Sequence, residues 1–468
     1  MSRVFVFGID GMPPELVFSE YLDELPTIKK LMENGIYGKL RSTIPPSTIL
    51  AWSAFASGYD PGQLGVYSYT YRVNSSLDEK KLVNSTCVKK DLIWDVLSKH
   101  GKKCIVLNVP LTYPAKKING IMVTDFLTPD FESDCTYPKE FKQEIRDVLE
   151  EDYMFDVSGF VGYKAIPPKE LLKLVYKMTD MQIKLALHLL KNEEWDFFMS
   201  VFIGSDRLHH MMWKYTDKSH PEYSEDPELR NSIKDYYKYL DSKLAEFLKF
   251  PGNDATIIVS SDHGMVKTKG RINLSDWLIK EGYLVLKEKF REELKNKISP
   301  LKLSEVDWSK TKAYSVGAYQ GRIYINRKKR DPYGIVDDEE YEFLREELKE
   351  KILKIPDVNG KKIDNAVFKP EDIYDSFDSE SPDLIVFFDG LAWGVNPDIG
   401  HDSIYSERTL AGADSAGHAL YGSFIMSGNK VTNHGKIEEI NILDVAPTMY
   451  EILGIENEDV KRKPIKYK

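Results

Sequence analysis

Residues 4–14, VFVFGIDGMPP, begin with an apolar run, VFVFGI, that predicts a buried strand and end in an Asp-Gly-Met-Pro-Pro turn. The next segment, residues 15–35, spaces its apolar residues as a helix does and ends at a glycine. Strand, turn and helix in this order form the opening unit of an α/β fold. Asp10 is the first polar residue after the predicted strand.

The same alternation of strand and helix recurs along the chain. Apolar runs predict strands within residues 103–109, 195–203, 255–260, 383–388 and 423–426, and helical spacing predicts helices within residues 93–99, 170–190, 231–248 and 441–453. Continuous apolar strands between helices are typical of a sheet that is covered on both faces. We therefore predict an α/β fold with a largely parallel sheet, helices on both faces and cap insertions.

Two regions lack this alternation of strand and helix. Residues 128–170 are rich in Asp, Glu, Tyr and Pro, and residues 285–378 are strongly charged and contain small elements such as GRIYIN. We predict a single α/β domain over residues 1–468, with 128–170 as a cap insertion and 285–378 as a second insertion or subdomain.

The composition of the chain disfavours nucleic-acid and membrane partners. The chain has 468 residues, of which 64 are Lys or Arg and 74 are Asp or Glu, so its net charge of -10 disfavours non-specific nucleic-acid binding. No apolar run in the sequence is long enough for a membrane span or a signal peptide. Three widely spaced cysteines indicate a reducing compartment. We expect a cytoplasmic protein with no membrane or nucleic-acid partner, and the sequence does not indicate an oligomeric state.

Carboxylates directly follow three of the predicted strands. Asp10 follows the first, Asp206 follows residues 195–203, and Asp262 with His263 follows residues 255–260. Because ligands of open α/β sheets bind at the carboxyl ends of strands, we expect these side chains to meet. His210 stands four residues after Asp206; if a helical turn starts after the strand, the two lie on one face and can hold one metal ion.

His418 precedes the predicted strand at residues 423–426 and completes a set of three Asp and three His. Such a mixture of nitrogen and oxygen ligands suits two ions of Zn²⁺, or of Mn²⁺, rather than Ca²⁺. His209 remains an alternative to His210, and His401 remains an alternative to His418.

The candidate nucleophile is Thr48, in the stretch STIPPSTILAWSAFASGYDPGQLG at residues 42–65. It follows two prolines and precedes a helical segment, and the free N–H groups and dipole of a helix N-terminus favour an anion. A metal ion would further stabilise an alkoxide there. Ser47 is the alternative hydroxyl.

Five motifs occur in order along nearly the whole chain: Asp10 after a strand, Thr48 with Gly58, Pro61 and Gly65, the pair Asp206 and His210, the run Asp262-His263-Gly264-Met265, and Gly417-His418. Together they resemble the alkaline phosphatase superfamily and, within it, the type I phosphodiesterase/nucleotide pyrophosphatase branch. The chain is also similar to a microbial group of phosphohydrolases and phosphomutases.

The resemblance implies two metal sites, with Asp206, His210 and His418 at one and Asp10, Asp262, His263 and the hydroxyl of Thr48 at the other. It also implies a phosphohydrolase that cleaves small phosphate esters, of the phosphodiester or nucleotide pyrophosphate type, through a phosphothreonine intermediate. The alternatives are a phosphotransferase or phosphomutase that uses the same site, and a non-catalytic binding protein.

The sequence departs from the nucleotide pyrophosphatase pattern at two places. Thr48 is followed by Ile-Leu-Ala where those enzymes resemble T-F-P-N, and Tyr69 occupies the place of their phosphate-binding Asn. Another donor is therefore required, and the candidates are the hydroxyl of Tyr69, the backbone N–H of Ile49 and the side chain of Arg207. This leaves nucleotide specificity open.

Overall fold

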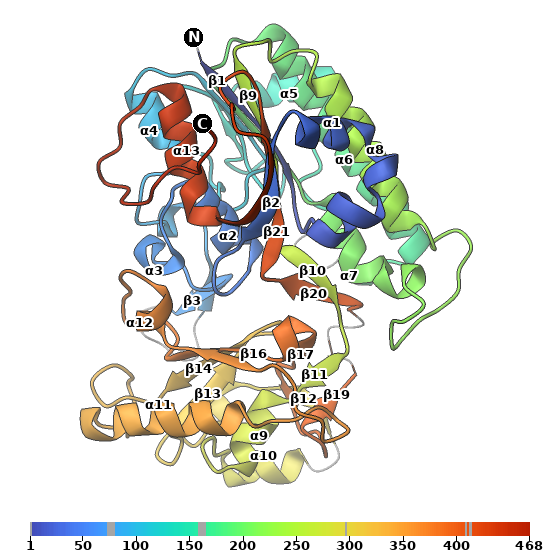
Figure 1. Ribbon diagram of the computed structural model, residues 1–468. Helices are drawn as coiled ribbons and strands as arrows, with labels where there is room; N and C mark the ends of the chain where they lie inside the picture. Colours follow the sequence, from blue (N-terminus) through green and yellow to red (C-terminus); the bar gives the residue numbers. More distant parts are fainter. Residues whose placement is uncertain (1, 73–79, 158–164, 295–296, 408–409, 411–413) are drawn as a thin grey trace. The chain divides into compact units, whose positions relative to one another are not determined.

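The computed structural model describes residues 2–72, 80–157, 165–294, 297–407, 410 and 414–468 (Figure 1). The chain forms two compact units. Unit 1 comprises Met1–Leu64, Asn84–Met265 and His418–Lys468, and unit 2 comprises Gly65–Val83 and Val266–Gly417.

Unit 1 is built on a nine-stranded sheet with the order β22-β2-β21-β9-β1-β8-β5-β6-β7. Its strands are β1 (Arg3–Ile9), β2 (Gly35–Arg41), β5 (Cys104–Leu107), β6 (Gly120–Val123), β7 (Thr136–Tyr137), β8 (Phe197–Phe202), β9 (Ala255–Ser260), β21 (Tyr421–Ser427) and β22 (Gly435–Asn441). β1 runs parallel to β8 and β9, β5 to β6 and β8, and β2 to β22, whereas β21 and β7 are antiparallel to their neighbours. The prediction of a largely parallel α/β sheet is confirmed.

Helices cover both faces of this sheet (Figure 1). α2 (Thr48–Phe55), α4 (Ile93–Lys99) and α13 (Val445–Leu453) share one core with Val4 and Val6 of β1. The alternate residues Phe5 and Phe7 contact Phe247 of α8 (Ser232–Phe247), with ring centroids 6.0 and 5.4 Å apart. Burial of each such ring contributes about 1.5–3 kcal/mol, so β1 stabilises both layers. The face of α8 also carries α1 (Pro26–Glu33), α5 (Phe141–Leu149) and α6 (Pro168–Asn192).

β1 approaches α2 closely because residue 8 is glycine. A Cβ atom at Gly8 would lie 2.7 Å from Cη2 of Trp52 and 2.9 Å from Cγ2 of Val201. Because Gly8 has no side chain, the indole of Trp52 in α2 can lie directly on β1.

The predicted single helix over residues 15–35 is wrong. The segment forms a short π-helical turn at Leu16–Glu20, a 3₁₀ turn at Leu22–Glu24 and then α1, which begins at Pro26. Proline lacks the N–H and clashes with the preceding turn, so it can start a helix but not continue one. Asp241 caps α1 by accepting from the N–H groups of Thr27 and Ile28, at 3.1 and 2.8 Å.

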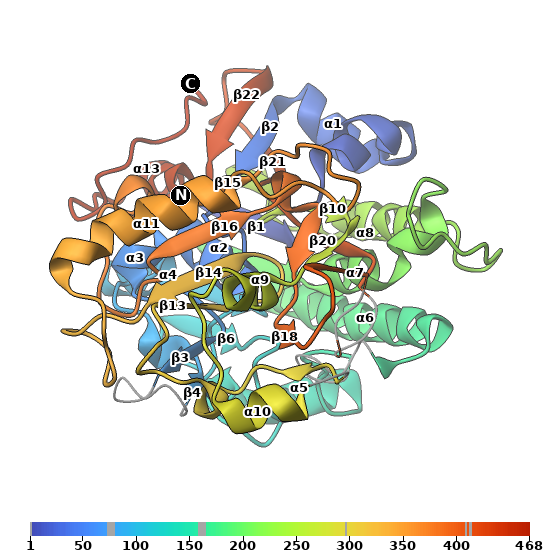
Figure 2. The ribbon, with the colours of Figure 1, turned by 90° about the horizontal axis from the view of Figure 1, so that it is seen from below.

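Unit 2 contains a four-stranded antiparallel sheet with the order β13-β14-β16-β15, covered by α11 (Figure 2). These elements are β13 (Ala313–Val316), β14 (Gly321–Ile325), β15 (Ala366–Phe368), β16 (Leu384–Phe387) and α11 (Asp338–Ile352). The run at 383–388 thus forms a strand as predicted, but this strand belongs to unit 2 and not to the central sheet.

The smaller elements of unit 2 are β3 (Thr70–Arg72), β4 (Lys80–Leu82), β11 (Gly270–Ile272), α9 (Leu274–Lys280), α10 (Glu288–Glu293), β12 (Ser299–Pro300), α12 (Pro370–Ile373), β17 (Trp393–Val395), β18 (Asp398–Ile399) and β19 (Tyr405–Ser406). Residues 285–378 lie within unit 2, which extends well beyond them, and residues 128–170 lie within unit 1, with 158–164 outside the described residues. The division into one domain with two insertions stays a prediction. None of the described helices is long and apolar enough to cross a membrane.

Candidate active site

Three adjacent strands of the central sheet end at the same edge, and each is followed by a buried carboxylate. Asp10 follows β1, Asp262 follows β9, and Asp206 lies in the first turn of α7 (Gly204–Thr216), just after β8. All three are at most 2% exposed. The structure therefore brings them together as the strand pattern predicts.

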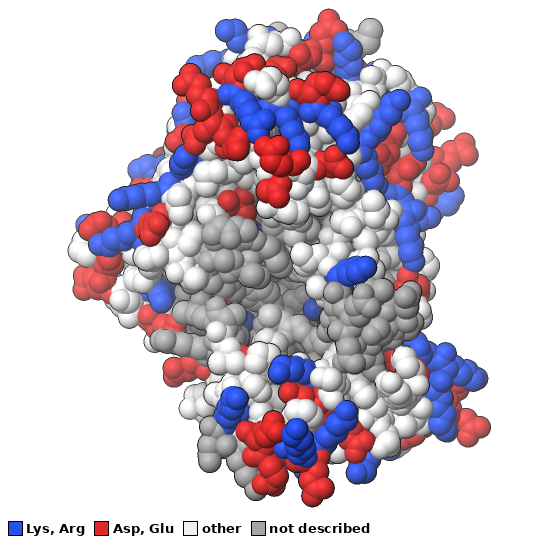
Figure 3. Space-filling view, turned by 180° about the vertical axis from the view of Figure 1, so that it is seen from behind, with Lys and Arg blue, Asp and Glu red and all other residues white. Residues whose placement is uncertain are grey.

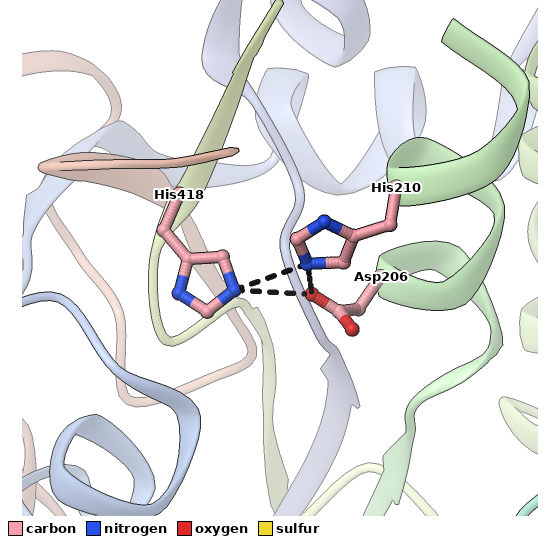
Figure 4. A group of neighbouring side chains, drawn as sticks. All are labelled: Asp206, His210 and His418. Carbon is pink, nitrogen blue, oxygen red and sulfur yellow. Dashed lines mark hydrogen bonds and ion pairs between the residues drawn. The ribbon is translucent and has the colours of Figure 1, made fainter. Parts of the chain in front are cut away.

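Asp206, His210 and His418 form the first candidate metal group (Figure 4). Oδ1 of Asp206 lies 3.2 Å from Nε2 of His210 and 3.5 Å from Nε2 of His418, and the two nitrogens are 3.3 Å apart. His210 stands one turn after Asp206 on α7, whereas His418 comes from β20 (Ala416–Ala419), far along the chain.

Asp10, Asp262 and His263 form the second candidate group. Nε2 of His263 lies 3.1 Å from Oδ2 of Asp262 and 3.7 Å from Oδ1 of Asp10. Oγ1 of Thr48 lies 3.3 Å from the same nitrogen. The rings of His263 and His418 stack with centroids 3.8 Å apart, so the two groups adjoin.

The spacing of these atoms suits one divalent cation in each group. Four ligands that surround zinc tetrahedrally at about 2.0–2.1 Å lie about 3.3 Å from one another. The distances between neighbouring ligand atoms, from 3.1 to 3.7 Å, lie close to that value.

Each carboxylate uses one oxygen within the protein and leaves the other without a donor. Oδ2 of Asp10 accepts from Nε1 of Trp52 at 2.9 Å, and Oδ1 of Asp262 accepts from the N–H of Gly11 at 3.2 Å. Oδ2 of Asp206 accepts from Nη1 of Arg207 at 2.7 Å. The second oxygens are buried and have no hydrogen-bond donor among the described residues: Oδ1 of Asp10, Oδ1 of Asp206 and Oδ2 of Asp262. Buried oxygens without a partner are costly, and one cation in each group would satisfy all three.

Two of the histidines have a fixed tautomer. Nδ1 of His263 lies 3.0 Å from the carbonyl oxygen of Gly264, and Nδ1 of His418 lies 2.9 Å from that of Pro46. A carbonyl only accepts, so each Nδ1–H donates and each neutral ring keeps its lone pair on Nε2. This arrangement is typical of metal-binding histidines.

The side chains of the candidate site carry an excess of negative charge. Burial, together with the charges of Asp262 and Asp206, holds the pKa of Asp10 well above its ordinary value, and burial raises the pKa of Asp262 similarly. Burial also acts to raise the pKa of Asp206, but His210, His418 and Arg207 outweigh it and leave that pKa well below the ordinary range. Burial lowers the pKa of His263, which keeps its ring neutral. Cations bound here would compensate the carboxylates.

Thr48 is the first residue of the buried helix α2, as predicted, and Ser47 precedes the helix. Trp52 follows one turn later and is the residue that donates to Asp10. One short helix therefore positions both the candidate nucleophile and a candidate metal ligand. The role of Trp52 was not predicted from the sequence, although its spacing of four residues from Thr48 was the available signal.

The structure places the alternative residues elsewhere. His209 contacts the hydroxyl of Tyr237 at 2.9 Å, and burial lowers its pKa to about 3. His401 belongs to unit 2, where its Nδ1 lies 2.9 Å from Oδ2 of Asp276. Neither belongs to a candidate metal group of the described residues.

The side chain of Arg207 is held by two carboxylates. Its Nε and Nη2 donate to Asp156 at 3.1 and 2.8 Å, and its Nη1 donates to Asp206. These bonds orient Asp206 and engage three of the five N–H groups of Arg207. Tyr69, another candidate for the phosphate donor, lies in unit 2.

The chain is similar to known proteins at the level of family and of fold. The family model for type I phosphodiesterase/nucleotide pyrophosphatase matches residues 4–414. A search of curated proteins gave no match. Among solved structures, human ectonucleotide pyrophosphatase/phosphodiesterase 5 has a TM-score of 0.56 at 14% identity, covering 99% of this chain and 97% of that chain.

Two murine structures of ectonucleotide pyrophosphatase/phosphodiesterase 5 are similar too. Each has a TM-score of 0.54 at 13% identity, and each match covers 97% of this chain. The match covers 96% of the first murine chain and 95% of the second. The first is an inactive threonine-to-alanine form in complex with AMP. At these identities the likeness shows a common fold.

Proposed function

Since this chain belongs to the type I phosphodiesterase/nucleotide pyrophosphatase family and is a phosphoric ester hydrolase, we propose that it cleaves small phosphodiesters or nucleotide pyrophosphates with Thr48 as nucleophile. The observation that carries the proposal is the position of Oγ1 of Thr48, 3.3 Å from Nε2 of His263 and thus beside the second candidate metal group.

Two divalent cations complete the proposed site. Asp206, His210 and His418 would hold one, and Asp10, Asp262 and His263, with the hydroxyl of Thr48, would hold the other. Zn²⁺ suits the mixed nitrogen and oxygen ligands best, and Mn²⁺ is the alternative. When bound, such ions favour the alkoxide form of a hydroxyl and neutralise negative charge on the phosphoryl and leaving-group oxygens.

The proposed reaction proceeds in two displacements at phosphorus. The hydroxyl of Thr48 loses its proton and Oγ1 forms a bond to phosphorus, while the bond to the leaving-group oxygen breaks and that oxygen takes up a proton, which gives a phosphothreonine ester. Water then attacks phosphorus, the bond to Oγ1 breaks, and the hydroxyl of Thr48 is restored. The free N–H groups in the first turn of α2 favour the negative charge beside Thr48 in both steps.

The murine relative described as an inactive threonine-to-alanine form with AMP bound supports a threonine nucleophile and a nucleotide-like ester. The charge of the chain supports a small substrate: the net charge is -10, and on the face shown in Figure 3 many of the described basic side chains lie among acidic ones. The three free cysteines, Cys87, Cys104 and Cys135, support a reducing, cytoplasmic compartment.

The test combines metal analysis with kinetics on bis-p-nitrophenyl phosphate and p-nitrophenyl phosphate, with Zn²⁺ or Mn²⁺ present. We expect about two metal ions per chain and cleavage of the diester. Thr48→Ala should lower kcat by at least about 10³-fold because it removes the nucleophile, whereas Thr48→Ser keeps a hydroxyl and partial activity. Thr86→Ala changes an exposed threonine in the same way and serves as the control.

Full diester cleavage by Thr48→Ala would show that the nucleophile assignment is wrong. Bound metal without hydrolysis of either ester would favour transfer of the phosphoryl group to an alcohol. A protein that binds no metal and hydrolyses neither ester, even after metal is added back, would favour a non-catalytic binding protein on this scaffold.

A further inference from the structure

Asn108 carries a buried donor that the proposed reaction has not yet used. The residue directly follows β5 and is 6% exposed, and its Nδ2 is buried without a hydrogen-bond partner. An amide nitrogen in this state loses its hydration and gains nothing in return, which is unfavourable unless a ligand accepts from it.

The backbone of Asn108 is held in an uncommon conformation. Its φ of 57° lies in the left-handed region, which asparagine tolerates better than most residues. Its N–H donates to the carbonyl oxygen of Val123 in β6 at 2.9 Å. Backbone strain of this kind persists where the surrounding structure holds it, and it is concentrated at ligand sites.

The side-chain amide is also oriented by the protein. The hydroxyl of Tyr153 donates to Oδ1 of Asn108 at 2.7 Å, and the tyrosine is itself only 4% exposed. With its oxygen engaged in this bond, the amide keeps both N–H groups of Nδ2 for another acceptor.

Asn108 lies at the same edge of the sheet as the candidate metal ligands. β5 pairs in parallel with β8, which pairs with β1, and Leu107 at the end of β5 is level with Ser200 of β8 and Phe7 of β1, so Asn108 follows at the end of the sheet where Asp10 also lies. Neighbouring strands are about 4.8 Å apart, which places the backbone of Asn108 about 5 Å from β8 and about 10 Å from β1.

One segment of the chain connects Asn108 to the first metal group. Tyr153 orients Asn108, and three residues later Asp156 binds Arg207, which in turn binds Asp206. The segment 153–156 therefore contacts Asn108 at one end and, through Arg207, the first metal group at the other.

The buried groups without a hydrogen-bond partner are of two kinds, which require partners of opposite character. The carboxylate oxygens of Asp10, Asp206 and Asp262 require cations, whereas Nδ2 of Asn108 requires an acceptor. A phosphate ester held by divalent cations satisfies both requirements at once, because its non-bridging oxygens accept from N–H donors while the cations contact the carboxylates.

We propose that Nδ2 of Asn108 donates a hydrogen bond to a non-bridging oxygen of the substrate's phosphoryl group, in place of the Asn that nucleotide pyrophosphatases carry where this chain has Tyr69. The inference rests on the proposed function, since it assigns a donor to that reaction. It makes Asn108 a catalytic residue and Tyr153 a positioning residue.

Two variants test the assignment. Asn108→Asp keeps the size and the tolerance for a left-handed backbone but has no N–H donor, and Asn108→Gly removes the side chain without backbone strain. With bis-p-nitrophenyl phosphate we expect kcat/KM to fall about 10²–10³-fold in both, mainly through kcat, with inhibition by vanadate weakened in parallel. Circular dichroism and the thermal unfolding temperature show whether each variant is folded.

Two further variants make the test specific. Asn119→Asp makes the same chemical change at an exposed position just before β6, at the opposite edge of the sheet, and should leave the kinetics unchanged. Tyr153→Phe removes only the hydroxyl that orients the amide and should cost less than the loss of Asn108, about 3–10-fold in kcat/KM.

Binding of inorganic phosphate to the zinc-loaded protein, measured by calorimetry, separates the inference from the proposed function. If no ester is hydrolysed but phosphate binds the wild type about tenfold more tightly than Asn108→Asp, the proposed function fails and the donor role stands. Equal phosphate binding, or kcat/KM within about twofold of wild type in both Asn108 variants, overturns the inference. A wild type that neither hydrolyses esters nor binds phosphate overturns both.

Discussion

The indole of Trp52 donates its Nε1–H to Oδ2 of Asp10, one helical turn after Thr48. Gly11 and Arg207 make the corresponding bonds to Asp262 and Asp206. Each bond occupies one oxygen of a carboxylate and leaves the other oriented for a ligand. The orientation of the candidate site thus depends on residues that do not themselves belong to either metal group.

At the residue scale, Trp52→Phe tests this dependence. The substitution removes the donor to Asp10 but keeps an aromatic ring in the core, so we expect zinc affinity or kcat/KM to fall about 10–100-fold while the fold is retained. Competitive zinc titration and diester kinetics measure the two quantities.

Trp94→Phe is the matched control, because Trp94 is buried in the same hydrophobic core and, among the described residues, its indole makes no hydrogen bond to either metal group. If both variants lose affinity equally, the effect comes from packing and not from the bond to Asp10.

At the scale of elements, a close apolar contact in unit 1 and a buried ion pair in unit 2 each hold neighbouring elements together. In unit 1, Gly8 of β1 lets α2 approach the strand closely, so the helix that carries Thr48 is positioned by apolar packing. In unit 2, a buried carboxylate just before β16 gathers several donors. Asp383 is 3% exposed and accepts from Arg330, the N–H of Ile325 and the hydroxyl of Tyr341.

Asp383→Ala should therefore destabilise unit 2. The change leaves the guanidinium of Arg330, 10% exposed, without its main partner, and breaking such a pair costs about 3–5 kcal/mol in free energy of unfolding. Differential scanning calorimetry measures the loss, and zinc affinity, which depends on unit 1, should be unchanged. An unchanged unfolding profile would show that Asp331, which also contacts Arg330, is a sufficient partner.

At the scale of the whole molecule, the two units have separate hydrophobic cores. The core around Trp52 and Trp94 belongs to unit 1, and the core around Ile323, Leu348 and Leu384 belongs to unit 2. All seven candidate site residues lie in unit 1. Metal binding should therefore stabilise one unit directly, and unfolding is expected to depart from a two-state transition.

The pH dependence of this stabilisation follows from the carboxylates. In the protein without metal, the raised pKa values of Asp10 and Asp262 contribute stability while these groups are protonated, and this contribution is lost as pH rises through the raised values. Zinc replaces the protons. Zinc should therefore raise the unfolding temperature of unit 1 more at about pH 8 than at about pH 5.5.

Calorimetry with zinc, and with a chelator to reverse its effect, checks this prediction. Asp383→Ala provides the contrast, since it should shift the transition of unit 2 and leave the zinc-dependent one in place. A zinc effect that is equal at both pH values would contradict competition between protons and metal.

Local sequence patterns determined much of this protein. Apolar runs and helical spacing predicted the α/β class, the largely parallel sheet and the position of Thr48 at the start of a helix. They also placed Asp10, Asp206 and Asp262 directly after strands, and His210 one turn after Asp206. Each of these features depends on neighbours within a few residues, and side-chain periodicity records such relations directly.

Only the tertiary structure decided which residues meet across the chain. Trp52 reaches Asp10 from 42 positions away, Tyr153 reaches Asn108 from 45, and His418 reaches His210 from 208. The strand at 383–388 likewise looks like a central strand but pairs within unit 2. Long-range pairing depends on how strands are ordered and packed, which no local periodicity encodes, and so the orphaned amide of Asn108 becomes visible only once the chain is folded.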